Sequence, residues 1–508
     1  MIPAVDGRLV ILAVLPVSLV VVTALRRFTE NRQNKPSLPP GPVPLPLLGN
    51  ILSINTKEPW LTYTQWHAAY GDLVFVRILD QEAVVVNSQR IAEALLDKRS
   101  RIYSDRPYLA TLEPFGFSID FAFMGYGDEW RLCRRLFHQT FRPESAVKFL
   151  PMQMRRAREM VVNLIEDPQH YRSHFVTFSL SIAMSVVYDY QANARNDPLI
   201  RVVDNALAPG LAMLTPERAV LLKTFPFLLK LPDWCWGSSI KRDAQLSTNR
   251  TTEMMDVPFR YAQQHMVGAY CLLTMVAENL QRLERQDQES KPMLETVLKK
   301  AATTAMIGSY ETTPSTLMAF ALAMVSYPDV QRRAQTEIDS VIGSDRLPMF
   351  EDRASLPYVE SVLRETFRWH PVAPLGIPHA ISSDDIYDGY FIPKGATVIC
   401  NTWSDRGISR DEKRYPDPSR FIPERFMDVD GALTDDDPAE YVFGLGRRGC
   451  PGRYTADASI WSAIVTMLAT VNLSPAKDDQ GNVIDFTPQF TTGLTQYSFS
   501  CVIPSYCH

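Results

Sequence analysis

The segment from Phe443 to Gly452 constrains this chain more than any other, because it sets one cysteine among four glycines. Glycines permit tight turns and let the backbone come close to a flat or bulky group. Pro451 suits the first turn of a helix, which we therefore expect to follow the segment. Cys450 would then lie at the amino terminus of a helix and beside Arg448, and both features favour a thiolate.

A lone thiolate in such a turn suits one strong bond to a metal that brings its other ligands with it, as iron does in haem. A plain buried cysteine explains the same residues, because free cysteines are often small core side chains. The spacing Gly444-x-Gly446-x-x-Gly449 also matches a dinucleotide-binding fingerprint. Too few residues follow it to complete such a domain, and no acidic residue stands about 20 positions further on. We regard that match as accidental, and the segment alone leaves the other two interpretations open.

The remaining sequence predicts one large, mainly α domain with a minor β region. Its longest predicted helix is mostly apolar, which implies burial on most sides, and Pro314 predicts a kink or break within it. Helical patterns cover the segments 152–165, 292–327 and 355–369. Short alternating runs predict strands over 73–78, 83–86, 390–400 and 497–503.

The composition excludes several classes of protein. Of the 508 residues, 46% are hydrophobic and 21% are charged, which is ordinary globular usage and excludes a mostly disordered chain. A formal net charge of −5 argues against a nucleic-acid partner. Seven cysteines without a C-x-x-C pair exclude a zinc ribbon or a thioredoxin-like site, and their low density indicates a reducing compartment.

The amino terminus predicts a single-pass membrane anchor within residues 1–28. Residues 9–25 carry no charge and would form a helix of roughly 26 Å, close to the thickness of an endoplasmic reticulum membrane. Arg26 and Arg27 follow at once, which predicts that the rest of the chain faces the cytosol. A cleaved signal peptide is the alternative, but its cleavage site would be poor. Residues 29–50 form a predicted basic, proline-rich hinge, and the domain would span 51–508.

The pattern Phe443-x-x-Gly446-x-Arg448-x-Cys450-x-Gly452 resembles the haem-binding signature of the cytochrome P450 family. The resemblance extends from the proline-rich hinge to the carboxyl end, and it is greatest with membrane-anchored fungal members of the eukaryotic microsomal type. It implies a cytochrome P450 fold around haem b. The haem iron would take Cys450 as its axial ligand, and Phe443 would lie beside the cofactor.

Further haem contacts follow from the same resemblance. Trp130 and Arg134, four residues apart on one predicted helix, would donate hydrogen bonds to the haem propionates. Arg448 would also reach a propionate, and His379 stands where the family usually has a basic residue. A solvated basic helix is the alternative explanation of the segment that contains Trp130.

Glu365 and Arg368 stand one helical turn apart, which alone predicts no more than a surface ion pair. In the family that the chain resembles, these two residues and Arg425 would form a buried triad that braces the cysteine loop. We expect this role to be structural.

Glu311 and Thr312 lie midway along the long apolar helix, where an acid and a hydroxyl are costly unless they are used or satisfied. They resemble the family's oxygen-activation motif, which implies a proton relay through a locally opened helix. The alternative is that Thr312 bonds back to a carbonyl one turn earlier. The motif departs from the family at Ser309, where a second glycine is commoner, and at the bulky Tyr310.

The resemblance implies a haem-thiolate monooxygenase that hydroxylates or epoxidises a lipophilic small molecule, as in fungal terpenoid or polyketide biosynthesis. NADPH would supply electrons through a separate cytochrome P450 reductase, with cytochrome b5 as a second candidate partner, and the protein would reside in the endoplasmic reticulum membrane. A haem-thiolate isomerase or dehydratase without a reductase is one alternative, and a non-catalytic haem protein is another. Glu311 and Thr312 argue against both alternatives.

Overall fold

The computed structural model describes residues 36–265, 274–285, 288–403, 408–478, 480, 482–484, 491, 495 and 502–505. None of the helices within these ranges combines the length and the apolar character that a membrane crossing requires. The predicted anchor within residues 1–28 lies outside the described residues, as does the first part of the predicted hinge. The described part of the hinge meets the first strand, where the N–H of Phe75 donates to Pro40 O at 2.9 Å.

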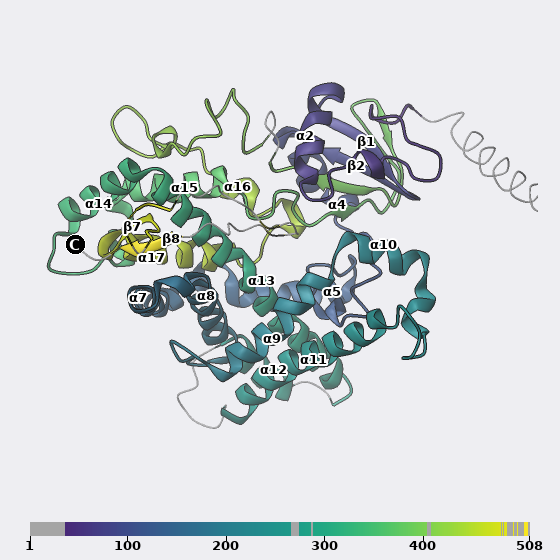
Figure 1. Cartoon of the computed structure of the whole chain (residues 1–508). Coiled ribbons are helices and arrows are strands. Elements are labelled where there is room, and N and C mark those ends of the chain that lie inside the picture. Colours follow the sequence, from purple (N-terminus) through teal and green to yellow (C-terminus); the bar gives the residue numbers. More distant parts are fainter. Residues whose placement is uncertain are drawn as a thin grey trace, which may run out of the picture.

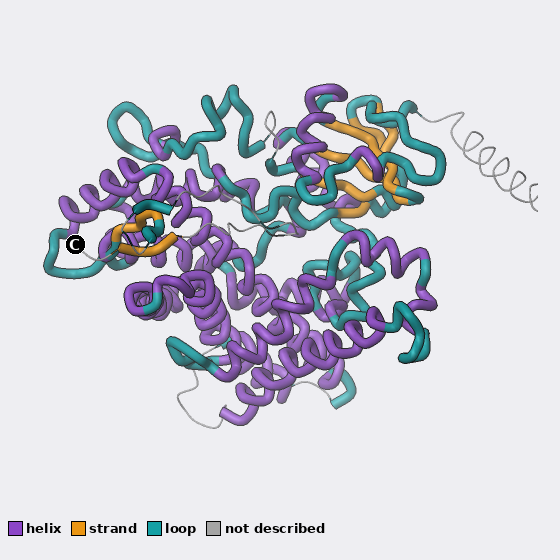
Figure 2. The backbone as a smooth tube through the Cα atoms, in the orientation of Figure 1, coloured by secondary structure: helices purple, strands orange, loops and turns teal. Residues whose placement is uncertain are grey.

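Helices make up most of the molecule, and strands are confined to small regions at two ends (Figure 2). This arrangement confirms the predicted mainly α fold with a minor β region. The longer helices are α2 (Pro59–Tyr70), α5 (Asp128–Phe141), α7 (Leu150–Glu166), α8 (Tyr171–Tyr188), α9 (Pro198–Met213), α10 (Pro216–Thr224), α11 (Ser239–His265), α12 (Met275–Glu284), α13 (Lys291–Ser326), α14 (Pro328–Ile342), α15 (Pro357–Trp369) and α17 (Arg453–Thr470). Short helices are α3 (Gln89–Ala92), α4 (Ser100–Tyr103), α6 (Pro143–Ala146) and α16 (Ala439–Val442).

The longest of these helices, α13, runs through the centre of the molecule and is buried along most of its length (Figure 1). It packs against α5, α8, α11, α15 and α17. The predicted helix over 292–327 is confirmed, and of the predicted kink or break at Pro314 the break does not occur. The helix continues to Ser326, and the proline only removes the N–H that would have bonded the carbonyl of Tyr310.

The strands form three small sheets. The largest has the order β1-β2-β6-β3, in which β1 and β2 are antiparallel, β2 and β6 are parallel, and β3 and β6 are antiparallel. It lies with α2 at the end of the molecule opposite α7 and α14 (Figure 1). The strands are β1 (Leu73–Ile78), β2 (Gln81–Val86), β3 (His379–Ala380), β4 (Asp385–Tyr387), β5 (Tyr390–Ile392), β6 (Thr397–Cys400), β7 (Asn472–Pro475) and β8 (Val502–Ser505).

Most predicted boundaries agree with the structure to within a few residues. Helix α15 begins at Pro357, two residues after the predicted start, because Ser355 belongs to the preceding 3-10 turn. The strand predicted over 497–503 corresponds in part to β8, and residues 497–501 lie outside the described part of the chain. The glycine-rich loop is preceded by α16 and not by a strand, and no doubly wound sheet surrounds it within the described residues. The dinucleotide fingerprint is therefore accidental, as expected.

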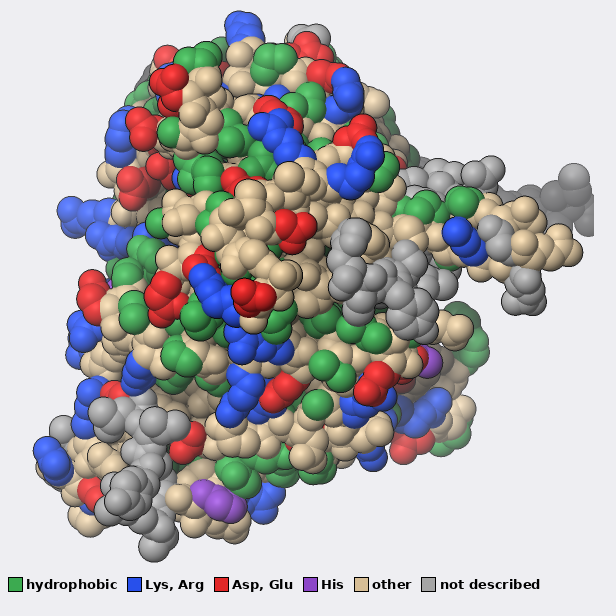
Figure 3. Space-filling view, turned by 90° about the vertical axis from the view of Figure 1, so that its left-hand side faces the viewer, with side chains coloured by type: hydrophobic (Ala, Val, Ile, Leu, Met, Phe, Trp, Pro, Cys, Tyr) green, Lys and Arg blue, Asp and Glu red, His purple; other side chains and the backbone are tan. Residues whose placement is uncertain are grey.

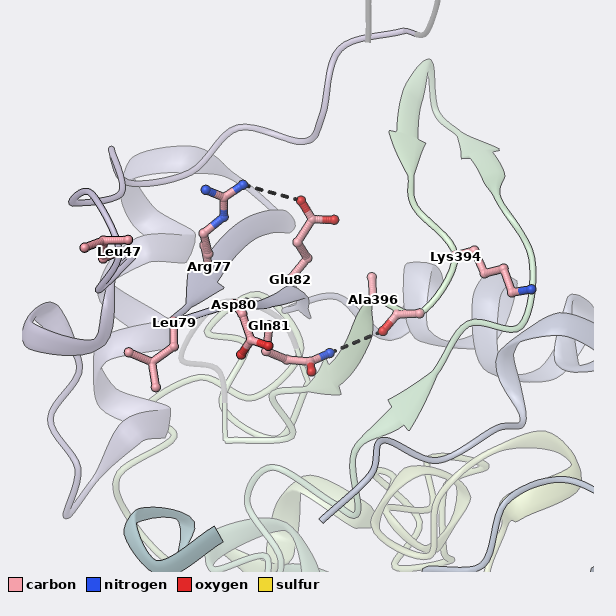
Figure 4. A pocket seen from close by; sticks show the side chains of 9 residues that line it. Leu47, Arg77, Leu79, Asp80, Gln81, Glu82, Lys394 and Ala396 are labelled. Carbon is pink, nitrogen blue, oxygen red and sulfur yellow. Dashed lines mark hydrogen bonds and ion pairs between the residues drawn. The ribbon is translucent and has the colours of Figure 1, made fainter. Parts of the chain in front are cut away.

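The surface of the described residues mixes charged and apolar side chains and has one hollow near the largest sheet. On the face that Figure 3 shows, acidic and basic side chains are interspersed with apolar ones. A hollow of about 490 Å³ lies where the β1–β2 turn approaches the turn before β6 (Figure 4). Arg77 pairs there with Glu82, and Gln81 donates to Gly395 O at 3.3 Å. None of the predicted site residues lines this hollow.

Candidate functional site

Cys450 lies in the loop between α16 and α17, and this loop folds back on itself. The backbone N–H of Cys450 donates to Phe443 O at 2.7 Å, which joins the two ends of the signature. Gly446 has a φ of +58°, and a Cβ built there would lie 2.1 Å from the carbonyl oxygen of Leu96. Both the backbone conformation and the lack of space therefore require glycine at 446. The hydrogen bond to Phe443 and the close approach of Gly446 to Leu96 therefore fix the backbone position of Cys450.

The electrostatic surroundings of Cys450 differ from the prediction. Burial raises the pKa of the thiol, and the Gly452 N–H, Arg134 and Arg453 oppose this shift. Helix α17 begins at Arg453, so Pro451 precedes the helix instead of occupying its first turn. The protein alone therefore favours the neutral thiol, and a metal at the sulfur would be needed to hold the thiolate.

Arg448 extends away from Cys450 into a polar cluster. Its guanidinium donates to Ser104 O at 2.8 Å and to Met124 O at 2.7 Å, and it lies 4.3 Å from the ring centre of Trp130. Arg134 lies one turn beyond Trp130 on α5, and its charge acts on the Cys450 sulfur. The structure thus brings Trp130, Arg134 and Arg448 together around the cysteine loop.

His379 joins this cluster but not as a cation. Its Nδ1 lies 2.7 Å from Tyr103 O, so it is the nitrogen that carries the proton in a neutral ring. Burial, together with the charges of Arg106 and Arg448, lowers the pKa of His379 to about 3. The ring of His379 is therefore neutral near pH 7 in this arrangement, and its contact with haem stays a prediction.

Arg106 is a site residue that the sequence did not reveal. Its guanidinium donates to Ala122 O at 2.9 Å and to Ile377 O and Pro378 O at 2.8 Å. Burial lowers the pKa of Arg106 to about 9, and the neighbouring Arg448 contributes to the shift. One arginine in a loop forms no pattern, and two of its three carbonyl partners, Ile377 and Pro378, lie 271 and 272 residues away in the chain. Only the fold shows that it faces the cluster.

Arg448 lies close enough to Arg106 and to Arg134 for their like charges to disfavour one another. Burial and the charge of Arg134 lower the pKa of Arg448 to about 10. Asp105 and Asp120 are the carboxyl groups of the described residues that oppose these cations, and burial raises the pKa of Asp120 to about 6. A group that carries two carboxylates would balance the excess positive charge. The cluster therefore fits the propionates of haem, and Cys450 fits its iron.

The triad of Glu365, Arg368 and Arg425 forms a second charged cluster. Glu365 accepts hydrogen bonds from Arg368 at 2.6 and 2.8 Å and from Arg425 at 3.2 Å. The side chains of Glu365 and Arg368 are 0% exposed. Helix α15 also reaches the start of the cysteine loop, because the rings of Phe367 and Phe443 make an edge contact at 5.4 Å.

Glu311 and Thr312 are neighbours on α13, yet no hydrogen bond joins these two described residues. Thr312 Oγ1 donates to Gly308 O at 2.7 Å, which is the backbone contact expected under the alternative interpretation. Glu311 Oε2 instead accepts from the hydroxyl of Thr495. Burial raises the pKa of Glu311, and the hydrogen bond from Thr495 opposes that shift. The structure therefore shows a half-buried acid beside a hydroxyl that is bonded elsewhere.

The relay residues and the cysteine cluster share one side of α13. Phe121 links them, because its N–H donates to Thr304 Oγ1 at 3.1 Å and its carbonyl accepts from Arg448 at 3.4 Å. Thr304, Gly308 and Thr312 recur every four residues and thus lie on one helix face. A Cβ at Gly308 would meet no atom within 4 Å, so this face borders open space.

The two departures from the family motif are accommodated on other faces of α13. Ser309 O accepts a hydrogen bond from Ser179 of α8 at 2.7 Å. Tyr310 is buried, and its hydroxyl donates to Asp204 of α9 at 2.6 Å. The bulk of Tyr310 therefore fills the contact with α9.

Comparison with known proteins agrees with this geometry. The family model for cytochrome P450 matches residues 39–500, and the chain belongs to the cytochrome P450 family. Cytochrome P450 monooxygenase 176 of Postia placenta is 35% identical over 471 residues, which cover 92% of this chain and 90% of that protein. Cytochrome P450 monooxygenase claR of Ampulloclitocybe clavipes is 36% identical over 465 residues, which cover 91% of this chain and 84% of that protein. The protein is a fungal-type cytochrome P450 monooxygenase with haem b as its cofactor, and a reductase supplies its electrons from NADPH.

Proposed function

We propose that this enzyme inserts one oxygen atom from O2 into a lipophilic small molecule, by hydroxylation or epoxidation, in fungal secondary metabolism such as terpenoid or polyketide biosynthesis. The observation that carries the proposal is the pairing of a glycine-rich cysteine loop with an arginine cluster and a half-buried acid on α13. Haem supplies the activation of dioxygen and its transfer to carbon when it is bound. The chain supplies the ligand, the anchoring charges and the proton path.

Cys450 would bind the iron, while Trp130, Arg134 and Arg448 would hold the propionates, with Phe443 beside the porphyrin. Arg106 would add a third cation at the same place, and neutral His379 would orient Tyr103 and its neighbours. The triad of Glu365, Arg368 and Arg425 would fix the backbone around the loop without contacting haem.

Glu311 and Thr312 would deliver protons on the open face of α13. Glu311 suits this role because burial raises the pKa of its carboxyl group, which favours holding a proton that it can later release. Thr312→Ala should leave haem bound but divert electrons to hydrogen peroxide, lowering product per NADPH roughly tenfold or more. Thr313→Ala, at the adjacent buried threonine, is the matched control. Equal coupling in the two variants would remove Thr312 from the relay.

Membrane association is also part of the proposal. Large apolar side chains are exposed on two neighbouring segments, including Leu47 at 88% and Trp236 at 100%. The two segments belong to one end of the molecule, because Lys223 of α10 pairs with Asp80 of the β1–β2 turn at 2.9 Å (Figure 1). Exposed tryptophan and leucine near lysine suit a membrane interface. This supports attachment to the endoplasmic reticulum membrane, where the reductase and cytochrome b5 would meet the cytosolic face.

Two measurements test the proposed activity. The carbon monoxide spectrum of the reduced protein should show thiolate-ligated haem. Incubation with reductase, NADPH, labelled dioxygen and a panel of sesquiterpene hydrocarbons and aromatic polyketides should place one labelled atom in a product. Product formed without reductase would instead indicate an isomerase or dehydratase, and the correct spectrum without turnover of any panel member would indicate a non-catalytic haem protein.

A further inference from the structure

The carboxyl group of Glu311 is held by a residue from a distant part of the chain. Thr495 donates its hydroxyl proton to Glu311 Oε2, although 184 residues separate the two in sequence. We infer that Thr495 is a positioning residue that holds the carboxyl group of Glu311 in an orientation turned away from Thr312. This inference rests on the proton relay proposed above and adds a third residue to it.

The hydrogen-bonding capacity of the three side chains supports this assignment. A threonine hydroxyl carries one proton, and Thr312 already donates its proton to Gly308 O at 2.7 Å. Thr312 therefore cannot donate to Glu311 in this arrangement. The proton of Thr495 is the one that the structure directs at the Glu311 carboxylate. A proton can pass from Glu311 to Thr312 only after the carboxyl group leaves Thr495.

The contact between Thr495 and Glu311 and the contact between Thr312 and Gly308 differ in their exposure. Thr495 and Glu311 are both half-buried, whereas Gly308, which accepts from Thr312, is exposed and borders open space. In this orientation the carboxyl group is therefore held away from the open face of α13. Leaving Thr495 would allow it to turn toward that face and toward Thr312.

Groups around Glu311 other than Thr495 also influence the pKa of its carboxyl group. Arg172, at the start of α8, lowers the pKa of Glu311 and also acts on Tyr310. Tyr310 is fixed to Asp204, so its hydroxyl is directed at α9. The hydrogen bond from Thr495 favours the ionised carboxylate. Its removal should therefore raise the pKa of Glu311 and release the side chain.

Infrared spectroscopy of the haem-loaded protein can test the contact without any turnover. The carboxyl and carboxylate bands that Glu311→Gln removes identify Glu311. Thr495→Val should shift these bands and move their titration midpoint upward by about one pH unit, because a hydrogen bond to the ionised form is lost. Thr495→Ser keeps a hydroxyl and should restore both. Thr491→Val is the matched control, since Thr491 lies in the same segment and its hydroxyl faces the backbone of Thr495.

Turnover with reductase and NADPH provides the second measurement. Thr495→Val should raise the fraction of electrons lost as peroxide several-fold and enlarge the solvent deuterium isotope effect, with an unchanged carbon monoxide spectrum. Bands and coupling that match the wild type, or a failure of Thr495→Ser to restore them, would overturn the inference. An absent thiolate spectrum would instead contradict the proposed function. The two failures can be told apart, because the infrared bands of Glu311 do not report on the haem ligand.

Discussion

Two buried clusters of arginine side chains in this protein differ in how their charge is balanced. Around Glu365, the two guanidinium groups share one carboxylate and donate their remaining protons to backbone carbonyls such as Ser409 O and Pro418 O at 3.0 Å. Around Cys450, burial lowers the pKa of Arg106, Arg134 and Arg448, the charge of Arg448 lowers that of Arg106 further, and the charge of Arg134 acts in the same way on Arg448.

The difference separates a structural cluster from a binding cluster. Buried charges are tolerated when they are paired and hydrogen-bonded, so the Glu365 cluster is complete within the chain. The Cys450 cluster is complete only when an anionic group joins it. Buried cations that disfavour one another are therefore a physical sign of a cofactor site, and here they coincide with the one cysteine that lies in a glycine-rich loop.

Of the substitutions that test this difference between the clusters, Cys450→Ser should have the largest effect. The variant loses the soft sulfur ligand, so the thiolate-type carbon monoxide spectrum of the reduced protein should disappear completely. The arginine cluster would remain and could still attract a dianion. Cys235→Ser changes a half-buried cysteine of another region and should leave the spectrum intact. A thiolate spectrum that survives in Cys450→Ser would show that the ligand lies elsewhere.

Replacing Glu365 by glutamine should destabilise the protein whether or not haem is present. The substitution leaves the buried guanidinium groups of Arg368 and Arg425 without their carboxylate, which costs about 3–5 kcal/mol of unfolding free energy. Chemical denaturation measures this loss. Glu360→Gln on the same helix is the matched control, because Glu360 pairs with the partly exposed Arg353 and its loss should cost about 1 kcal/mol or less. A similar loss in both variants would contradict a special role for the triad.

Replacing Arg134 by glutamine should weaken haem binding without destabilising the haem-free protein, unlike the substitution in the Glu365 cluster. The variant removes one cation of the unbalanced cluster, so haem should leave roughly tenfold faster when one charge-assisted hydrogen bond to a propionate is lost. The haem-free protein should be as stable as the wild type or more so, because one source of repulsion is gone. Haem transfer to an acceptor protein and thermal unfolding of the haem-free form measure the two effects. Arg135→Gln, at the exposed neighbouring position, should change neither.

The sequence predicted those features of the site that short spacings determine. The cysteine loop, the Trp130–Arg134 pair and the Glu365–Arg368 pair each lie within a few residues, so their pattern is visible without the fold. Arg106 and Thr495 were missed because their partners are far away in sequence. The charge of His379 could not be predicted from the sequence, because its pKa depends on burial and on two arginines that only the fold brings near. The continuity of α13 through Pro314 was misjudged because packing on all sides outweighs one lost backbone hydrogen bond.

The smallest predicted effect concerns His370, which lies beside the complete cluster. Burial lowers its pKa to about 3, and Arg410 contributes. The unfolded chain therefore binds a proton below its ordinary pKa of about 6.5 while the folded protein does not, so stability falls as the pH drops through that value. Between pH 7 and pH 5.5 this histidine alone should remove about 1.3 kcal/mol, and His370→Asn should abolish that part of the acid sensitivity. Because no group of the haem site lowers the pKa of His370, the same difference should be found with and without haem, whereas a difference that changes on haem binding would show that the two clusters are coupled.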